Sequence, residues 1–270
     1  MLNNQKGVAF VKGLIYFCVA LLVVSITLTI GFIVVQGIAT LNIKSVIHSS
    51  PLIVTTLMVI GLSLLIAVPI GIFSAIYLRL YAKDTKLVRL IRFSIDSLTG
   101  VPSIIFGLFA LSFFIYYLGF SRSILTGSLT MGIVIMPLII KNTEEAIKTI
   151  DKAQIQGSLA LGATMYDTVT KVVVPFCMNG IINGVILGIG RIVGETAALM
   201  FVIGTMQGIP TSITQPGATL STQLYMILQE PTYAEGGINE AYTLALILLI
   251  IVVIINLIVK VTNARYRKDK

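Results

Sequence analysis

Residues 14–35 read LIYFCVALLVVSITLTIGFIVV, an apolar run that contains no charge. A helix of roughly 20 such residues crosses the hydrocarbon core of a bilayer, which is about 30 Å thick. Similar runs recur along the chain, and one of them is interrupted only by Arg191 and Glu195. The sequence therefore predicts about six transmembrane helices, at approximately residues 14–36, 52–79, 97–120, 123–141, 172–206 and 241–260.

The composition favours lipid as the solvent of these segments. Hydrophobic residues make up 56% of the 270 residues and charged residues 11%, and the mean hydropathy is +0.99. A soluble domain of this length does not bury so much apolar surface. Strands of a membrane barrel would alternate polar with apolar residues, and the sequence has no such alternation. The expected fold class is therefore all-α, a polytopic membrane protein with one transmembrane domain over residues 1–270.

The residue pattern does not indicate a leader, a disulfide or a metal site. The first apolar run is longer than the core of a secretory signal and lacks a clear small-x-small cleavage site after it. Cys18 and Cys177 both lie within apolar runs, so we expect small core residues rather than a disulfide. His48, the single histidine, lies beside serines, where a solvated side chain is expected.

The distribution of Lys and Arg predicts the orientation of the helices. The net charge is +8, and the bases cluster in every second connection. Those expected in the cytoplasm are Lys6, Lys12, Arg79, Lys83, Lys86, Arg89, Arg92, Lys141, Lys148, Lys152, Lys171, Lys260, Arg265, Arg267, Lys268 and Lys270. The opposite side carries Lys44 and Arg122, and its long loop at 207–240 contains glutamates and no base. Both termini are therefore expected in the cytoplasm, and binding to nucleic acid is not needed to explain the charge.

A long cytoplasmic connection at 142–171 carries its own helix signals. Asn142 or Thr143 can cap a helix whose first turn holds Glu144 and Glu145. A second short helix should then follow in the same connection.

That second helix is expected to end at Gly162, since glycine suits a left-handed C-cap. Thr164, with Asp167 three places on, predicts a capping box that opens the next helix. A helix, a glycine stop and a new helix would form an exposed elbow on which a partner could dock. A plain loop that joins two spans is the alternative.

The fifth predicted span combines small residues with two charges. Gly180, Gly184 and Gly188 form the small-xxx-small pattern that lets helix backbones approach closely, and Arg191 and Glu195 fall on the same arc. We expect this face to pack against a second, similar subunit. Arginine at the bilayer centre costs roughly 2.5–3.5 kcal/mol, so it needs compensation. The two charges either neutralise each other, or the arginine binds an oxyanion while the glutamate aligns it.

The elbow resembles a signature of permease subunits of ATP-binding cassette importers, E-A-A, three residues, Gly, nine residues, Ile-x-Leu-Pro. Here Gly162 precedes VVVP at 172–175, and QGS at 156–158 replaces E-A-A. The resemblance implies a coupling helix that fits a groove of an ATPase subunit. The residues expected at that contact are Gly157, Ser158, Leu161, Gly162, Ala163 and Thr164.

The same stretch superficially matches a nucleotide-binding P-loop. Gly157, Gly162 and Thr164 have the spacing of its glycines and hydroxyl, but Ala163 stands where the lysine is required. The chain is therefore not expected to be an enzyme or to bind a cofactor. ATP and Mg²⁺ would be bound by the partner ATPase.

RIVGETA at 191–197 looks like the R-x-x-G-E-T-A motif of the phosphate importer permeases usually called PstA and PstC. Residues 97–108, with the core GVPSIIFGL, are similar to their third helix, and residues 220–231 with the basic tail look more like PstA. The resemblance implies a type I importer fold and a substrate pathway that includes Arg191, Glu195 and Thr196.

The expected function is that of a permease subunit that moves inorganic phosphate across the cytoplasmic membrane. The resemblance implies a second, PstC-like permease, two ATP-binding cassette ATPase subunits and an extracytoplasmic phosphate-binding protein as partners. A sulfate or molybdate permease could use the same arginine. An ion channel or secondary carrier without an ATPase is a different class. An intramembrane enzyme is disfavoured, because the spans carry no Ser-Lys, His-Glu-x-x-His or paired-aspartate arrangement.

A short amphipathic helix is expected in the external loop. Leu220, Leu224, Ile227 and Leu228 repeat at helical spacing after the turn at 215–217. We expect this helix at the outer mouth, as a plug or a contact for the binding protein. The alternative is a helix that rests on the membrane interface.

Overall fold

The computed structural model describes residues 2–205, 208–230 and 236–268. Those residues form helices joined by turns and loops, and they contain no strand. Five helices are long and apolar enough to cross a membrane, and a sharply bent pair of helices makes a sixth span if it is counted as one. The predicted all-α, polytopic fold is confirmed.

The first two spans follow the first two apolar runs. α1 (Leu2–Thr40) continues beyond its run at both ends, and the short α2 (Ile43–His48) connects it to α3 (Ser50–Ile76). The α3 helix ends in a π-helical turn, η1 (Tyr77–Tyr81). Together α3 and η1 make one span at the position that the sequence predicts.

The third span is broken. It consists of α4 (Lys86–Thr99) and α5 (Ser103–Ala110), which continues as the π-helical η2 (Leu111–Tyr117), and its axis turns by 107° between α4 and α5. Pro102 has no amide hydrogen to donate and disfavours helical backbone at the residue before it, so it favours a break at this point. The prediction of one continuous span at 97–120 is therefore wrong.

The fourth span is longer than predicted. α6 (Ile124–Lys148) runs past the predicted end at residue 141 without interruption. The Asn142 side chain donates to the carbonyl oxygen of Leu138 at 2.8 Å. Thr143 also belongs to α6, and its side chain is buried. Neither residue caps a new helix, so that prediction is wrong. This part of the sequence contains no glycine or proline that would end a helix.

The predicted elbow is present. α7 (Lys152–Ala160) ends before Gly162, whose φ of +88° lies in the left-handed region that favours glycine. A new rod then begins with α8 (Met165–Thr168), passes through the π-helical η3 (Val169–Val173) and continues as α9 (Val174–Gly194).

The fifth span also breaks, so the prediction of one helix over 172–206 is wrong. Glu195 and Thr196 separate α9 from the short α10 (Ala197–Val202). The predicted helix of the external loop exists as α11 (Leu220–Gln229), and the chain ends with α12 (Ile238–Lys268).

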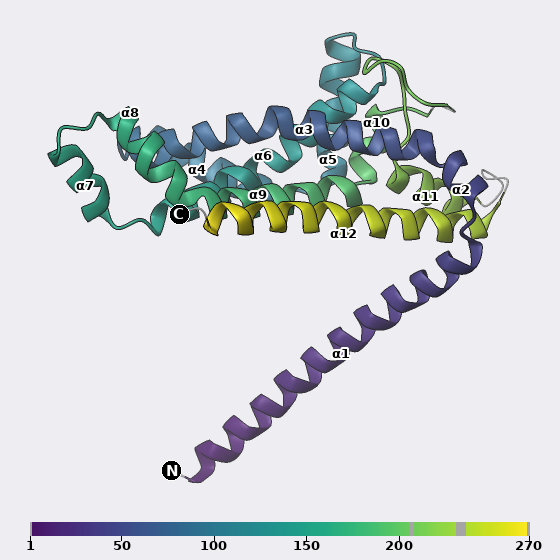
Figure 1. Ribbon diagram of the computed structural model, residues 1–270, viewed down its shortest axis with the longest axis horizontal. Helices are drawn as coiled ribbons and strands as arrows, with labels where there is room; N and C mark the ends of the chain where they lie inside the picture. The colour runs from purple at the N-terminus through teal and green to yellow at the C-terminus, as the bar shows by residue number, and fades with distance from the viewer. Residues whose placement is uncertain (1, 206–207, 231–235, 269–270) are drawn as a thin grey trace.

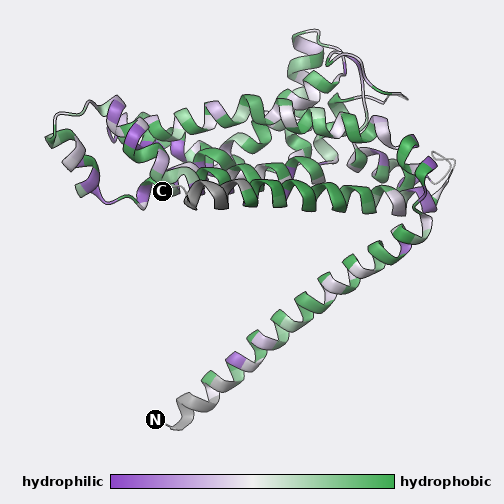
Figure 2. Cartoon of the chain, viewed as in Figure 1, coloured by the Kyte–Doolittle hydropathy of each residue, from purple (hydrophilic) through white to green (hydrophobic). Residues whose placement is uncertain are grey.

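The helices α3, α6, α9 and α12 run side by side in one bundle (Figure 1). The elbow lies at one end of this bundle, which we call the elbow end, and α2 and α11 lie at the opposite end. Hydrophilic residues concentrate around α7 and α8, whereas the bundle is mostly hydrophobic (Figure 2). The main core cluster lies between these helices and comprises Val59, Ile60, Ala67, Phe106, Ile124, Met131, Val134, Ile135, Ile139, Ile189, Ile192, Val193, Leu199 and Ile203.

The α1 helix diverges from the bundle and touches α12 only near its own C-terminal end (Figure 1). Thr40 and Thr243 place their hydroxyl oxygens 3.0 Å apart there. Residues 10–32 of α1 are exposed, including Cys18, so the prediction that Cys18 is a core residue is wrong. Cys177 is buried, as predicted, and both thiols are free.

Candidate functional site

Arg191 lies in the last turn of α9, just before the helix breaks. Its side chain is partly buried and makes no hydrogen bond or ion pair with any residue that the structure describes. A cation at this position is favourable because the C-terminal end of a helix carries a partial negative charge. The guanidinium donors are therefore available to a ligand.

Glu195 belongs to the break itself. Its backbone is extended, with φ −76° and ψ 125°, and its side chain is buried. The carboxylate oxygen Oε1 accepts a hydrogen bond from the Ala198 amide at 3.2 Å, so Glu195 supports the start of α10. The predicted ion pair with Arg191 is wrong, because α9 stops at Gly194 and the glutamate points onward along the chain. Thr196 follows in the break and is partly buried.

The glycine face of α9 is used inside this chain. Ideal Cβ atoms on Gly180 and Gly184 would lie only 2.4 Å from Ala146 Cβ and 3.0 Å from Asn142 Cβ of α6. A Cβ on Gly188 would meet Ile135 of the same helix at 3.6 Å. The predicted role of these three glycines in packing against a second subunit is corrected accordingly: they let α6 and α9 approach each other.

The opposite face of α9 is exposed. It carries two asparagines, Asn179 and Asn183, and two glycines, Gly190 and Gly194, beside which there is open space. On a helix that advances by about 100° per residue, Asn179, Asn183 and Gly190 fall within a narrow arc. Polar amides are costly in hydrocarbon, so residues of this kind normally face protein or water. Arg191 falls on the arc of the glycine face, on the side of that arc nearer the exposed face.

Hydroxyl groups from α3 and α11 hold the break in place. The Ser221 hydroxyl donates to the backbone carbonyl of Glu195 at 2.8 Å, and the Leu220 amide donates to the Thr56 hydroxyl at 3.0 Å. Each bond satisfies a backbone group that no regular helix pairs at this point. Sequence reasoning did not identify Thr56 or Ser221, because isolated hydroxyls in apolar helices give no pattern.

The α11 helix packs into the bundle as well as resting against its end. Leu220 and Ile227 are fully buried, whereas Leu228 is 63% exposed. The four residues that the sequence assigns to one apolar face are therefore divided between the core and the surface. The interpretation of α11 as a helix that only rests on the membrane is wrong.

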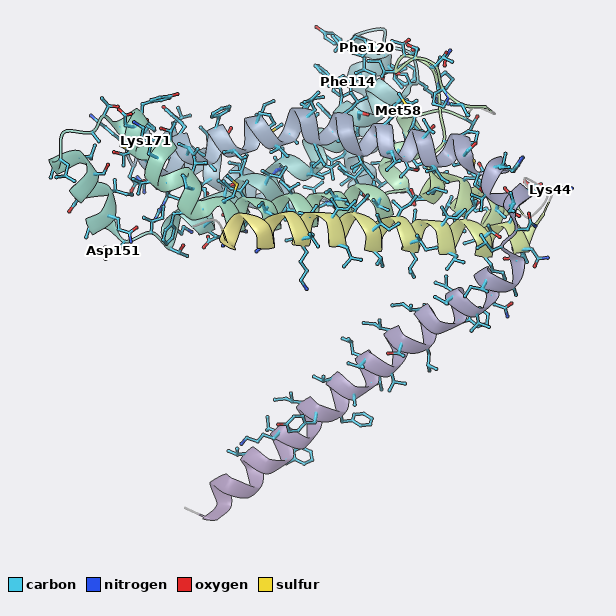
Figure 3. The ribbon with its side chains drawn as sticks, in the orientation of Figure 1. Lys44, Met58, Phe114, Phe120, Asp151 and Lys171 are labelled. Carbon is cyan, nitrogen blue, oxygen red and sulfur yellow. The ribbon has the colours of Figure 1, made fainter. Side chains whose placement is uncertain are left out.

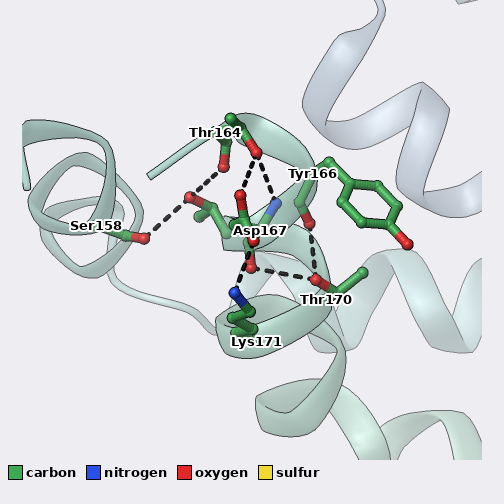
Figure 4. Close-up of polar contacts among 7 residues, drawn as sticks. Ser158, Thr164, Tyr166, Asp167, Thr170 and Lys171 are labelled. Carbon is green, nitrogen blue, oxygen red and sulfur yellow. Dashed lines mark hydrogen bonds and ion pairs between the residues drawn. The ribbon is translucent and has the colours of Figure 1, made fainter. Parts of the chain in front are cut away.

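A chain of polar contacts fixes the shape of the elbow (Figure 4). The N-cap half of the predicted capping box is present: the Thr164 hydroxyl oxygen accepts a hydrogen bond from the Asp167 amide at 3.1 Å. The Asp167 carboxylate accepts from the Thr164 hydroxyl in place of the Thr164 backbone amide. Asp167 also pairs with Lys171 at 2.7 Å, and the hydroxyls of Ser158 and Thr168 lie 2.9 Å apart. Side-chain hydrogen bonds therefore stabilise the turn between α7 and α8.

The elbow presents an uncovered surface. Leu161 is 90% exposed and Tyr166 is 72% exposed, and open space surrounds both Gly157 and Gly162. Asp151 and Lys171 mark this end of the molecule in Figure 3. Leu161 and Tyr166 are therefore accessible to another protein at this end of the molecule.

A family model, the binding-protein-dependent transport system inner membrane component, matches residues 67–268. The chain belongs to this family. It is accordingly a multi-pass inner-membrane permease, and the family match includes both the broken fifth span and the elbow.

Individual relatives and solved structures agree with the family. The chain is 34% identical over 203 residues to the phosphate transport system permease protein PstA 1 of Mycobacterium tuberculosis (strain CDC 1551 / Oshkosh), which is 75% of this chain and 66% of that relative. It is 26% identical to the probable ABC transporter permease protein YqgI of Bacillus subtilis, over 87% of this chain and 90% of that relative. An inward-facing structure of the MetNI methionine ABC transporter has a TM-score of 0.63 at 20% identity, over 81% of this chain and 95% of that chain. The fold is thus that of an ABC importer permease.

Proposed function

We propose that this chain is a permease subunit of an ATP-driven importer and that its substrate is inorganic phosphate. A PstC-like permease, two ATP-binding cassette ATPase subunits and an extracytoplasmic phosphate-binding protein complete the complex. ATP and Mg²⁺ bind to the ATPase subunits. The permease performs no covalent chemistry, and it changes which side of the membrane can reach the anion.

Arg191 is the observation that carries the phosphate assignment. It is a guanidinium that has no acceptor among the described residues, beside a break in a membrane helix, in a chain similar to relatives named phosphate transport system permease proteins. Guanidinium binds phosphate through two parallel hydrogen bonds. An unpaired arginine in a low-dielectric setting supplies the positive charge that offsets the hydration which a phosphate anion loses there.

The two faces of α9 support a proposed arrangement of the subunits. The glycine face is occupied by α6, so the second permease subunit approaches from the exposed face that carries Asn179, Asn183, Gly190 and Gly194. The passage for the anion then lies between the two subunits, within reach of Arg191. The ATPase subunit contacts Leu161 and its neighbours at the tip of the elbow.

The experiment measures phosphate uptake into proteoliposomes that contain the full complex, the binding protein and internal ATP. Arg191→Gln should lower uptake at least about tenfold, since charge-assisted hydrogen bonds contribute roughly 1.5–3 kcal/mol. Arg191→Lys keeps the charge but loses the planar fork, and should retain part of the uptake. Arg79→Gln, in the exposed part of η1, is the matched control and should transport normally.

Competition with sulfate and molybdate separates the proposed substrate from the other tetrahedral oxyanions. Excess sulfate that suppresses phosphate uptake, or sulfate uptake in place of phosphate uptake, would assign the site to that anion. Uptake that needs no ATP would assign the chain to a carrier or channel. Normal phosphate uptake by equal amounts of assembled Arg191→Gln complex would show that this arginine is not part of the pathway.

A further inference from the structure

At the elbow end, α4 is joined to α6 by two ion pairs. Arg92 Nε lies 3.5 Å from Glu144 Oε1, and Lys141 Nζ lies 3.0 Å from Asp96 Oδ1. The side chains of the second pair are 49% and 61% exposed, whereas Glu144 is only 14% exposed. Exposed pairs contribute little, so Arg92 and Glu144 form the important contact.

Arg92 makes a three-way junction. Its Nη2 donates to the Leu78 carbonyl oxygen of η1 at 2.6 Å, while Nε faces Glu144 of α6. Both Nε and the Glu144 Oε1 atom are buried and lack a hydrogen bond partner among the described residues. The Arg92 side chain is 36% exposed, so the pair is partly buried, and at this separation it is attractive without being fully satisfied. A small displacement of α4 relative to α6 would therefore change its energy noticeably.

The apolar contact of α4 with the bundle is small by comparison. Val88 is the buried residue of α4, and it packs with Ala75, Leu78 and Ile140. Because α4 is weakly anchored by apolar surface, the ion pairs have a large share in deciding whether it follows α6.

One end of this connection lies near the elbow, and the other lies near the break in the fifth span. Glu144 lies one turn before the end of α6, and α7 of the elbow begins at Lys152. At the other end, α4 turns into α5, where a Cβ on Gly107 would lie 2.7 Å from the Ala198 Cα of α10. That contact is three residues after Glu195. The chain thus links the elbow to the break beside Arg191 through α6, α4 and α5.

We propose that Arg92 and Glu144 are positioning residues for transport: they clamp α4 to the elbow end of α6, so that movement of the elbow reaches the break in the fifth span. This proposal rests on the proposed ATP-driven transport, but it does not depend on which oxyanion is carried. The clamp acts on the coupling between ATP hydrolysis and transport, and neither residue contacts the substrate.

The test compares two neighbouring glutamates. Glu144→Gln removes the charge that faces α4, whereas Glu145→Gln removes one that pairs only with Lys148 of the same helix. In proteoliposomes with equal amounts of assembled complex, Glu144→Gln should lower the phosphate moved per ATP hydrolysed about fivefold, within the usual range of coupling energies. Glu145→Gln should leave this ratio at the wild-type value.

A double variant, Arg92→Gln with Glu144→Gln, separates a clamp from a merely structural pair. If Glu144→Gln acts only by leaving a partly buried arginine unpaired, removing both charges restores the ratio and overturns the proposal. A clamp predicts that the ratio stays low. Wild-type ratios in Glu144→Gln would also overturn it. A wild-type complex that hydrolyses ATP without moving phosphate would instead refute the proposed function, so the two failures are distinguishable.

Discussion

Gly162 illustrates how one backbone angle can shape an exposed turn. Its φ of +88° is strained for any residue with a Cβ atom, and open space surrounds it. Left-handed backbone costs roughly 1–2 kcal/mol for most residues, with asparagine an exception. The sequence was sufficient to identify this position, because a glycine after a helical run is a strong local signal.

We expect Gly162→Leu to uncouple ATP hydrolysis from transport, because the leucine strains the turn beside the exposed Leu161. The complex should still insert and assemble, since the substitution meets no neighbouring atom. Gly162→Asn preserves the left-handed backbone and should retain most of the coupling. The measurement is the ratio of phosphate uptake to ATP hydrolysis. Equal coupling in wild type and Gly162→Leu would contradict a docked elbow.

Residue-level reasoning succeeded where the interaction was local and failed where it crossed a break. The cap of Asp167 by Thr164 depends on three residues of one turn, and it is present as predicted. The pairing of Arg191 with Glu195 required a continuous helix between them. Extended backbone at Glu195 directs the carboxylate toward Ala198 instead.

At the scale of elements, periodicity located the glycine face of α9 but could not name the helix that covers it. The small-xxx-small pattern predicts that the backbone of another helix approaches closely. In the structure that helix is α6 of the same chain. Apolar runs likewise placed the membrane segments. The bend near Pro102 has a local signal in the proline itself, whereas the break at residues 195–196 is held by contacts from α11 that the local sequence does not contain.

A pair of glycine variants on one helix separates internal packing from subunit contact. Gly180→Val forces a side chain against Ala146, where even a Cβ would lie at 2.4 Å, and overpacking typically costs about 1–3 kcal/mol. Its thermal unfolding midpoint in detergent should fall clearly below the wild-type value. Gly190→Val extends into open space and should keep the stability of the isolated chain. It should weaken association with the partner permease, measured by co-purification.

The opposite pattern would contradict the arrangement of the helices. A stable Gly180→Val chain that no longer binds its partner would return the glycine face to the subunit interface. A destabilised Gly190→Val chain would place an internal contact on the face that the structure leaves exposed.

At the scale of the whole molecule, most of the α1 helix does not pack against the rest of this chain. The most apolar stretch of the segment from Phe10 to Thr40 has no buried residue. Its ordered contact with the bundle is confined to the end near α12, where Gly37 lies against Leu246. Hydropathy predicts that such a helix spans lipid, but hydropathy does not indicate which other helix packs against it.

The orientation of the molecule is the remaining prediction, and it follows from the unequal distribution of Lys and Arg. The elbow end should face the cytoplasm and the α11 end the outside. Leu161 and Ile43 are suitable reporters, because they are 90% and 79% exposed and lie in the elbow and in α2 respectively. In a background in which Cys18 and Cys177 are replaced, Ile43→Cys should react with a membrane-impermeant maleimide in intact cells stripped of their outer layers. Leu161→Cys should react only after the membrane is permeabilised, and reaction of Leu161→Cys alone in intact cells would show that the helices run in the opposite direction.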